Sequence, residues 1–472
     1  MNKELQIELR KKEYNFKYAD KIVDDNFKAR QDRKETEINL EETENSNVAN
    51  EGVIKNGNTV KGEVAGDIRN GTESKRLKVD CDLGVGSPIV DDPELPLVRK
   101  KIDWKNKLYL APLTTVGNLP FRRVCKKFGA DITCGEMAMS LQILQGHQPE
   151  WALVQRHDSE DIFGIQLCGP SPQQMGRVAQ LIDDGKINCD FVDINLGCPI
   201  DLVYSRGMGS GLMARKKPLE VMVRSMSSIL ARNSQTPLTI KMRTGVYSDK
   251  HLAHNLAPMA VKSWGASMIS IHGRSREQRY TRSADWKYIQ RVAEAANEDA
   301  VSNVYGGTVP IFGNGDIINY EDYNIFRETA PKVSGVMIAR GALIKPWVFK
   351  EIKDQRHWDI STSERLEMIQ DYVNYGLEHW GSDDKGVETT RRFLLEWLSF
   401  LHRYVPHGIL ASPPQRMNER LPKYFRGRTD IETLLCSPIC EDWIKISEMF
   451  LGKPPDNFRF EPKHRAHAYK QS

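Results

Sequence analysis

The sequence lacks long apolar runs. None of its hydrophobic stretches approaches the ~18 residues that a helix needs to cross a bilayer. Its opening residues, Met-Asn-Lys-Glu-Leu-Gln-Ile-Glu, are too charged for a secretory signal peptide. These absences argue against a membrane partner and against a secreted protein. We therefore expect a cytoplasmic location, with the nucleus as a second compartment.

The sequence also lacks a disulfide framework, a zinc-binding array and a nicotinamide-binding fingerprint. Its eight cysteines are scattered through 472 residues, which is typical of reduced thiols. Cys436 and Cys440 lie four residues apart, but no second Cys or His pair stands at zinc-site spacing. No Gly-x-Gly-x-x-Gly turn is evident. We predict no metal site and no separate nicotinamide-binding domain.

Net charge is small and unevenly distributed. The whole chain carries +4, whereas residues 1–100 sum to −3 and residues 101–472 to +7. The more basic part is a weak indication of a polyanionic partner. Nothing in the composition indicates a protein partner.

Residues 1–95 are rich in Lys, Glu, Asp and Asn and have little regular apolar spacing. Such a stretch buries too little surface to offset the entropy of ordering it. We expect a charged, largely disordered extension with a short helix near Glu4 to Phe27. Within it, Lys75-Arg76-Leu77-Lys78 fits a solvated basic cluster better than a nuclear-import or RNA-contact patch.

Residues 96–360 alternate short apolar runs with helical patterns. Helix boundaries are marked by residues such as Asn118 with Pro120 at the start and Gly129 at the end, and Pro218 to Leu230 is another helical pattern. Eight strand–helix units in about 240 residues are the size of a (β/α)₈ TIM barrel, with an open doubly wound sheet as the alternative. The predicted strands are Leu108–Leu113, Ile132–Glu136, Phe163–Leu167, Phe191–Leu196, Leu238–Met242, Met268–Ile271, Val309–Phe312 and Gly335–Ala339.

Residues 361–472 carry no strand pattern and predict a C-terminal all-helical domain, with helices over Ser363–His379 and Glu388–Tyr404. From Arg391 to Arg428, basic and aromatic side chains are interleaved, beginning with Arg391, Arg392 and Phe393. This mixture suits phosphate neutralisation and base stacking. An amphipathic core helix with a solvated charged face explains it equally well, and both interpretations stay open.

One strand ends at a chemically capable thiol. Phe191 to Leu196 is an apolar, partly β-branched run, and Gly197 and Pro199 end it on either side of Cys198. Barrels and open α/β sheets place reactive groups at the carboxyl ends of their strands. The alternative is that Cys198 is a small buried hydrophobic residue.

The other predicted strands also end in polar groups, which should share one face of a barrel. Glycine-rich turns after the last two strands, Gly313–Asp316 and Ala339–Gly341, are candidates for phosphate binding through exposed backbone N–H groups. Lys241 lies two residues from Arg243 and should point to the same mouth. A cation there could stabilise a flavin edge that becomes anionic on reduction; a lysine paired with a carboxylate is the alternative.

Seven short motifs in this order resemble the tRNA-dihydrouridine synthases, from about Leu108 to the helical tail. The most specific is Asn195-Leu196-Gly197-Cys198-Pro199. The others are Ala111–Thr114, Gln166–Gly169, Lys241–Arg243, Ile271–Arg274, Asn314–Asp316 and Ala339–Gly341. Three further segments, Cys134–Ala138, Arg274–Tyr280 and Arg392–Leu398, are similar to the eukaryotic type 3 class, which reduces uridine 47 of the variable loop in cytoplasmic tRNA.

The resemblance implies an FMN-dependent oxidoreductase that uses NADPH or NADH as reductant and tRNA as substrate. It implies that Cys198 is the catalytic general acid, which protonates C5 of uracil after hydride reaches C6. The implied substrate contacts are Asn195, Arg243, Arg274, Arg279, Tyr280, Arg282, Arg391 and Arg392. The implied flavin contacts are Pro112, Leu113, Thr114, Gln166, Lys241, His272, Asn314, Gly315, Asp316, Ala339 and Arg340.

Members of the type 3 class often carry zinc fingers before the barrel, and this sequence has none. The chain is therefore either a shortened form or one that binds RNA through its barrel and tail. Two rival functions remain: a flavin barrel that reduces a small free molecule, and a tRNA-binding chaperone without catalysis. The basic, aromatic tail argues against the first, and the complete set of motifs argues against the second.

Overall fold

The apolar runs form parallel strands that close on themselves. The chain is described by a computed structural model over residues 3–48, 100–298, 308–410, 414–419 and 425–463. Every strand pair is parallel, and pairing of β2 with β4 closes the sheet, with the short β3 beside β4. The predicted eight-stranded TIM barrel is confirmed. The strands are β1 (Leu108–Leu110), β2 (Ile132–Cys134), β3 (Ala138–Met139), β4 (Ile162–Cys168), β5 (Phe191–Leu196), β6 (Leu238–Arg243), β7 (Met268–His272), β8 (Ile311–Asn314) and β9 (Gly335–Ile338).

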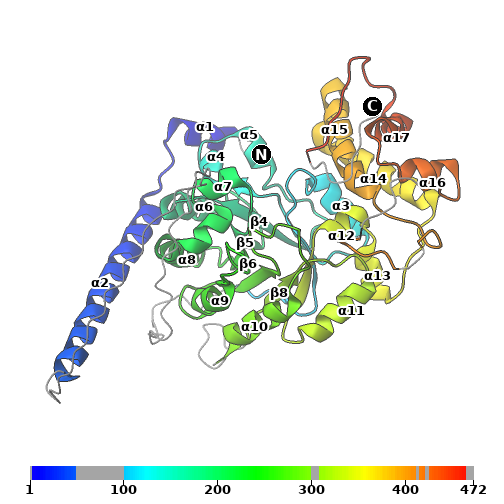
Figure 1. Cartoon of the computed structure of the whole chain (residues 1–472). Coiled ribbons are helices and arrows are strands. Elements are labelled where there is room, and N and C mark those ends of the chain that lie inside the picture. The colour runs from blue at the N-terminus through cyan, green and yellow to red at the C-terminus, as the bar shows by residue number, and fades with distance from the viewer. Residues whose placement is uncertain (1–2, 49–99, 299–307, 411–413, 420–424, 464–472) are drawn as a thin grey trace, which may run out of the picture.

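Helices surround the barrel (Figure 1). Most of them bury an apolar face in the core. Asn118 caps α3 as expected: its side chain accepts from the Phe121 N–H at 3.1 Å, and Gly129 follows at φ +97°. The helices that follow strands are α3 (Leu119–Lys127), α4 (Ser140–Leu144), α5 (Gln148–Ala152), α6 (Pro172–Asp183), α7 (Asp201–Ser205), the 3₁₀ helix η1 (Gly209–Ala214), α8 (Lys216–Leu230), α9 (Ala253–Lys262), α10 (Trp286–Asn297), α11 (Tyr320–Thr329), α12 (Arg340–Ile344) and α13 (Val348–Asp354).

Aromatic side chains fill the amino end of the barrel interior. Tyr109, Phe191 and Phe312 lie at the starts of three strands, and Trp104 precedes the first. Trp104 meets the Phe191 ring edge-on at 5.4 Å, and Tyr109 meets the Phe312 ring at 6.0 Å. Because packed rings fill this end, the polar residues at the opposite ends of the strands are the place to look for chemistry.

The C-terminal region is helical, as predicted. It comprises α14 (Thr362–Trp380), α15 (Asp384–Leu401), α16 (Asp430–Leu435) and α17 (Cys440–Leu451), which gather on one side of the barrel (Figure 1). Trp397 of α15 is fully buried against Phe121 and Tyr372, and its indole N–H donates to the Leu343 carbonyl at 3.1 Å. The helical region therefore shares a continuous core with the barrel, and a domain boundary at residues 360/361 stays a prediction.

The N-terminal extension needs a correction over residues 3–48. These residues form α1 (Lys3–Lys11) and α2 (Lys17–Val48), longer than the short helix expected, and α2 packs on α6 and α8 before it projects beyond the barrel (Figure 1). Leu5, Leu9, Ala19 and Val23 are buried. An ion pair between Arg177 and Asp20 at 2.7 Å also joins α2 to α6.

Residues 49–95, including the basic cluster at Lys75 to Lys78, lie outside the described residues. Over the part of the chain that the structure describes, no helix has both the length and the apolar character that a membrane crossing requires.

Candidate active site at the carboxyl ends of the strands

Cys198 lies at the tip of β5, where the sequence placed it. Asn195 shapes the turn: its side-chain oxygen accepts from the N–H groups of Gly197 at 3.0 Å and of Cys198 at 2.9 Å. The thiol is partly buried, beside Cys168 and Met208. Burial raises the pKa of Cys198 above its ordinary value, against the opposing effect of the Ile200 N–H and nearby cations. The thiol therefore holds its proton at neutral pH.

A chain of side-chain hydrogen bonds fixes Asn195. The Asn195 amide donates to Gln166 at 2.7 Å, and the Gln166 amide donates to Asp193 at 2.7 Å. Thr239 donates to the second oxygen of Asp193 at 2.7 Å. Burial raises the pKa of Asp193 to about 6. Sequence reasoning missed Asp193, although an acidic residue inside the apolar run from Phe191 to Leu196 marked it as unusual.

Lys241 presents a cation without a partner. It lies in β6 opposite Asn195 in the strand register. Among the described residues its ammonium group makes no hydrogen bond and no ion pair. Desolvation, and secondly the charge of Arg243, lowers the pKa of Lys241 to about 8. The paired-lysine alternative is therefore not what the structure shows, and a half-buried cation is available to an anionic ligand.

Two arginines and one carboxylate organise the turns after β7, β8 and β9. Asp316 accepts from Arg274 at 2.6 Å, from Arg340 at 3.0 Å and from the Ala284 N–H at 2.8 Å. Arg274 is fully buried. It also lies 3.3 Å from the His272 ring, whose pKa is lowered well below its ordinary value by burial and by the surrounding cations. His272 is therefore neutral in this cluster.

The glycine-rich turns pack tightly against neighbouring segments. Gly315 adopts φ +137°, and a Cβ there would stand 2.5 Å from the Cβ of Ala284. A Cβ on Gly341 would stand 2.0 Å from the Ile317 carbonyl oxygen. Asn314 donates to the Met337 carbonyl at 2.7 Å, so the turns after β8 and β9 are tied together. Ala339 and Arg340 remain half-buried at their edge.

Comparison with known proteins agrees with this arrangement. The family profile described as Dihydrouridine synthase (Dus) matches residues 109–402. The chain is 58% identical over 375 residues to a protein of Xenopus tropicalis named tRNA-dihydrouridine(47) synthase [NAD(P)(+)]-like, covering 79% of this chain and 56% of that protein. The chain belongs to the dihydrouridine synthase family.

Two further relatives with the same printed name extend the comparison. The protein of Homo sapiens is 55% identical over 386 residues, 81% of this chain and 56% of the relative. The protein of Arabidopsis thaliana is 47% identical over 436 residues, 92% of this chain and 60% of the relative. The chain thus spans little more than half the length of the curated relatives that it matches.

The loop after β1 completes the mouth of this dihydrouridine synthase barrel. Pro112 and Leu113 are half-buried and Thr114 is exposed. The next residue, Thr115, has φ +77° and donates its N–H to Glu136 at 2.6 Å. Burial raises the pKa of Glu136. Glu136, which sequence reasoning recognised only as a strand-end polar residue, therefore holds the loop in a strained conformation.

Arg243 was expected to contact substrate, but its guanidinium is used by the protein. It is buried and donates to the carbonyls of Gly197 at 2.7 Å and Ser275 at 2.9 Å. Arg243 therefore ties the Cys198 turn to the loop after β7. In that loop Arg279, Tyr280 and Arg282 are exposed, as a role in substrate binding requires.

The predicted RNA contacts in the helical region separate into two kinds. Arg391 is buried and donates to Ser447 at 2.7 Å and to the Gly452 carbonyl at 2.7 Å, so it stabilises the helical packing. Arg392 is exposed and pairs with Glu388 at 2.8 Å. Trp397 and Tyr404 are buried. The core-helix alternative describes Arg391, Trp397 and Tyr404, whereas Arg416, Arg426 and Arg428 are exposed, so RNA contact stays a prediction for these exposed residues. Arg420, Lys423 and Tyr424 lie outside the described residues.

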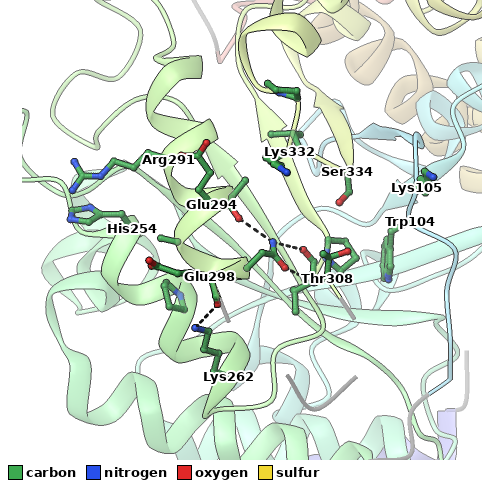
Figure 2. A pocket seen from close by; sticks show the side chains of 18 of the residues that line it. Trp104, Lys105, His254, Lys262, Arg291, Glu294, Glu298, Thr308, Lys332 and Ser334 are labelled. Atoms are coloured by element: carbon green, nitrogen blue, oxygen red, sulfur yellow. Dashed lines mark hydrogen bonds between the residues drawn. The ribbon is translucent and has the colours of Figure 1, made fainter. Parts of the chain in front are cut away.

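A cavity of about 1380 Å³ lies at the opposite end of the barrel. Its walls include Trp104, His254, Lys262 and Lys332 (Figure 2). It is lined by segments that precede strands or belong to helices. It contains none of the predicted site residues, and we assign no function to it.

Metal-binding geometry is also missing from the described ranges. No group of three or more His, Cys, Asp or Glu side chains gathers there as an ion site requires. The seven described cysteines are free thiols.

Proposed function

We propose that this protein uses FMN and NADPH to reduce one uridine of tRNA, at position 47, to 5,6-dihydrouridine. The single observation that carries the proposal is a partly exposed thiol at the tip of β5, near a lysine on β6 that has no hydrogen bond or ion pair among the described residues. Membership of the dihydrouridine synthase family and the printed names of the relatives support the substrate and its position.

The residues at the mouth fit FMN. Lys241 would hold the electron-rich edge of the ring, because it is a half-buried cation that feels the charge of Asp193 but has no hydrogen bond or ion pair among the described residues. The turns at Asn314 to Asp316 and at Ala339 to Arg340 would hold the phosphate through backbone N–H groups and a guanidinium. Pro112, Leu113 and Gln166 would line the ring.

Bound flavin would supply the hydride that C6 of uracil accepts. Cys198 then acts as the general acid and gives its proton to C5. Asn195 holds the turn that carries the thiol, and its hydrogen bonds through Gln166 to Asp193 prevent it from rotating. Since burial raises the pKa of Cys198, the thiol keeps its proton until it is needed, whereas a nucleophilic cysteine would require a lowered pKa.

The target base must leave the RNA stack, which costs a few kcal/mol that protein contacts offset. Tyr280 is exposed, and Arg340 lies 4.3 Å above its ring, which suits stacking on a base. Arg279 and Arg282 would neutralise phosphates beside it. We place this reaction in the cytoplasm, with the nucleus as a second compartment, and expect NADPH to reach the flavin from the same open face.

The decisive experiment combines purified protein, FMN, NADPH and an unmodified tRNA transcript, with dihydrouridine mapped along the product. One modified position in the variable loop is the expected result. Turnover of free uridine or of a small enone at a comparable rate, with untouched tRNA, would instead establish a small-molecule reductase. Protein that binds tRNA but remains colourless after addition of FMN would establish a non-catalytic binder.

A further inference from the structure

A single exposed carboxylate at the mouth holds two arginines. Asp201, the first residue of α7, lies three residues after Cys198. One of its oxygens accepts from Arg276 at 2.5 Å, and the other accepts from Arg279 at 3.1 Å. The Asp201 side chain is nevertheless 74% exposed. Both guanidiniums therefore meet at a point that solvent and a large ligand can reach.

The arginines are positioned by their own loop and not only by the carboxylate. Arg276 stacks over the Tyr204 ring at 3.7 Å, and its backbone N–H donates to the Gly245 carbonyl at 3.0 Å. The loop is closed by reciprocal hydrogen bonds between Ser275 and Gln278 at 3.0 and 3.2 Å. Two guanidiniums would therefore stay near each other if another anion replaced Asp201.

A phosphate diester can make this replacement. Its two free oxygens accept charge-assisted hydrogen bonds from guanidinium groups, as the two oxygens of a carboxylate do. The exposed Asp201 pairs are weak, because an ion pair in contact with water biases an equilibrium by about fivefold or less. An RNA backbone, which brings several phosphates at once, can compete with such a pair.

The surroundings favour a nucleic acid over a small anion. Ile200 and Leu202 flank Asp201 and are 50% and 61% exposed, and Tyr280, next to Arg279 in the chain, is 53% exposed. These apolar and aromatic side chains offer contact area to nucleotides on both sides of a bound phosphate. A free inorganic anion would use only the two arginines.

We propose that Asp201 is a built-in substitute for a substrate phosphate. Asp201 pairs with Arg276 and Arg279 until an RNA phosphate displaces it. Only a ligand that makes enough other contacts with the protein then breaks these two ion pairs. The inference rests on the proposed function in one respect, namely that the substrate is RNA. Asp201 then lowers the affinity of every RNA that uses these arginines by the same factor, so that at a given RNA concentration weakly held RNA loses the most occupancy.

The test compares Asp201→Asn with Asp249→Asn, an exposed aspartate in the loop after β6 for which no hydrogen bond or ion pair is found among the described residues. Both substitutions remove one negative charge near the mouth. Affinities for a tRNA transcript and for poly(U) are measured across a salt series with the full chain. We expect Asp201→Asn to bind both RNAs about two- to fivefold more tightly at low salt. Asp249→Asn should show a smaller change, and poly(U) and tRNA should gain by similar factors.

The same Asp201→Asn change in an Arg276→Ala, Arg279→Ala background should give no gain in affinity. A gain that persists without the arginines, or an Asp201→Asn protein that binds no more tightly than Asp249→Asn, would overturn the proposal. Thermal unfolding midpoints of the variants identify a loss of affinity that comes from a damaged fold. If wild-type protein converts tRNA while Asp201→Asn gains nothing, only this inference fails; if wild-type protein neither binds nor modifies tRNA, the proposed function fails as well.

Discussion

The two ends of the barrel differ in what they bury. The amino end is filled by aromatic rings and adjoins a cavity of about 1380 Å³ whose walls include Lys262, Arg291 and Lys332 (Figure 2). The carboxyl end buries the cations Arg243 and Arg274, together with the half-buried Lys241. Burying charge is costly unless a partner is present. The concentration of such charges at one end, and not the size of a hollow, therefore indicates where a ligand acts.

The partners at the carboxyl end also show which charges are structural. Arg274 has Asp316, and Arg243 has two backbone carbonyls. Lys241 has neither kind of partner among the described residues. The buried arginines that pair with the protein itself are therefore expected to position other residues, whereas Lys241 is expected to bind a ligand.

The largest expected effect is on the rate of product formation. Cys198→Ala should slow dihydrouridine formation by about 10²- to 10⁴-fold, the usual contribution of a general acid. Flavin content and NADPH oxidation should be retained. The neighbouring buried thiol provides the control, since Cys168→Ala should stay close to the wild-type rate. Wild-type product yield from Cys198→Ala would remove the thiol from the mechanism.

The next effect is on stability. Asp316→Ala leaves the fully buried Arg274 without its carboxylate, which should cost about 3–5 kcal/mol of unfolding free energy. Urea denaturation measures it. Asp371→Asn removes the partner of Lys127 in an exposed pair and should cost about 1 kcal/mol or less. Equal losses from the two substitutions would contradict the distinction between buried and exposed pairs.

Lys241→Met should separate ligand binding from stability. Loss of a hydrogen bond to a charged group, worth ~1.5–3 kcal/mol, should weaken FMN retention about tenfold or more. The pKa of Lys241 in the folded protein is about 8, below its ordinary value. The cost of burying the charged Lys241 therefore lowers the free energy of unfolding by its full amount below pH 8, and this cost decreases as the pH rises toward 10.5.

Without FMN, the methionine variant should accordingly be at least as stable as wild type at pH 7, and its advantage should shrink at pH 9. Thermal unfolding at the two pH values, together with fluorescence titration of FMN, measures both quantities. A variant that loses stability at pH 7 and binds FMN normally would show that Lys241 has a structural role.

The smallest effect should come from the amino end. Lys332 is exposed on the wall of the large cavity (Figure 2). Lys332→Ala should change tRNA affinity and dihydrouridine formation by about twofold or less, as surface substitutions usually do. A tenfold loss of tRNA affinity or of dihydrouridine formation would mean that the amino end of the barrel also takes part in the reaction.

Sequence reasoning succeeded where local pattern decides structure. The eight strands, the capped start of α3 and the position of Cys198 all follow from periodicity and from Gly, Pro and Asn at element ends. It failed where a charged helix is anchored by few residues, as in α2. It also left open whether the stretch from Arg391 to Arg428 contacts RNA or packs in the core, because the same sequence pattern fits both arrangements.

The sequence by itself determined the barrel, its order of elements and the thiol at the end of β5, because these depend on residues close together in the chain. Only the tertiary structure decided how the charges are paired. Asp316 meets Arg274 across 42 residues, and Asp201 meets Arg276 across 75. Such pairs form only after the barrel closes and brings the strand ends to one rim, so no local pattern could have shown that Lys241 would have no ion pair among the described residues.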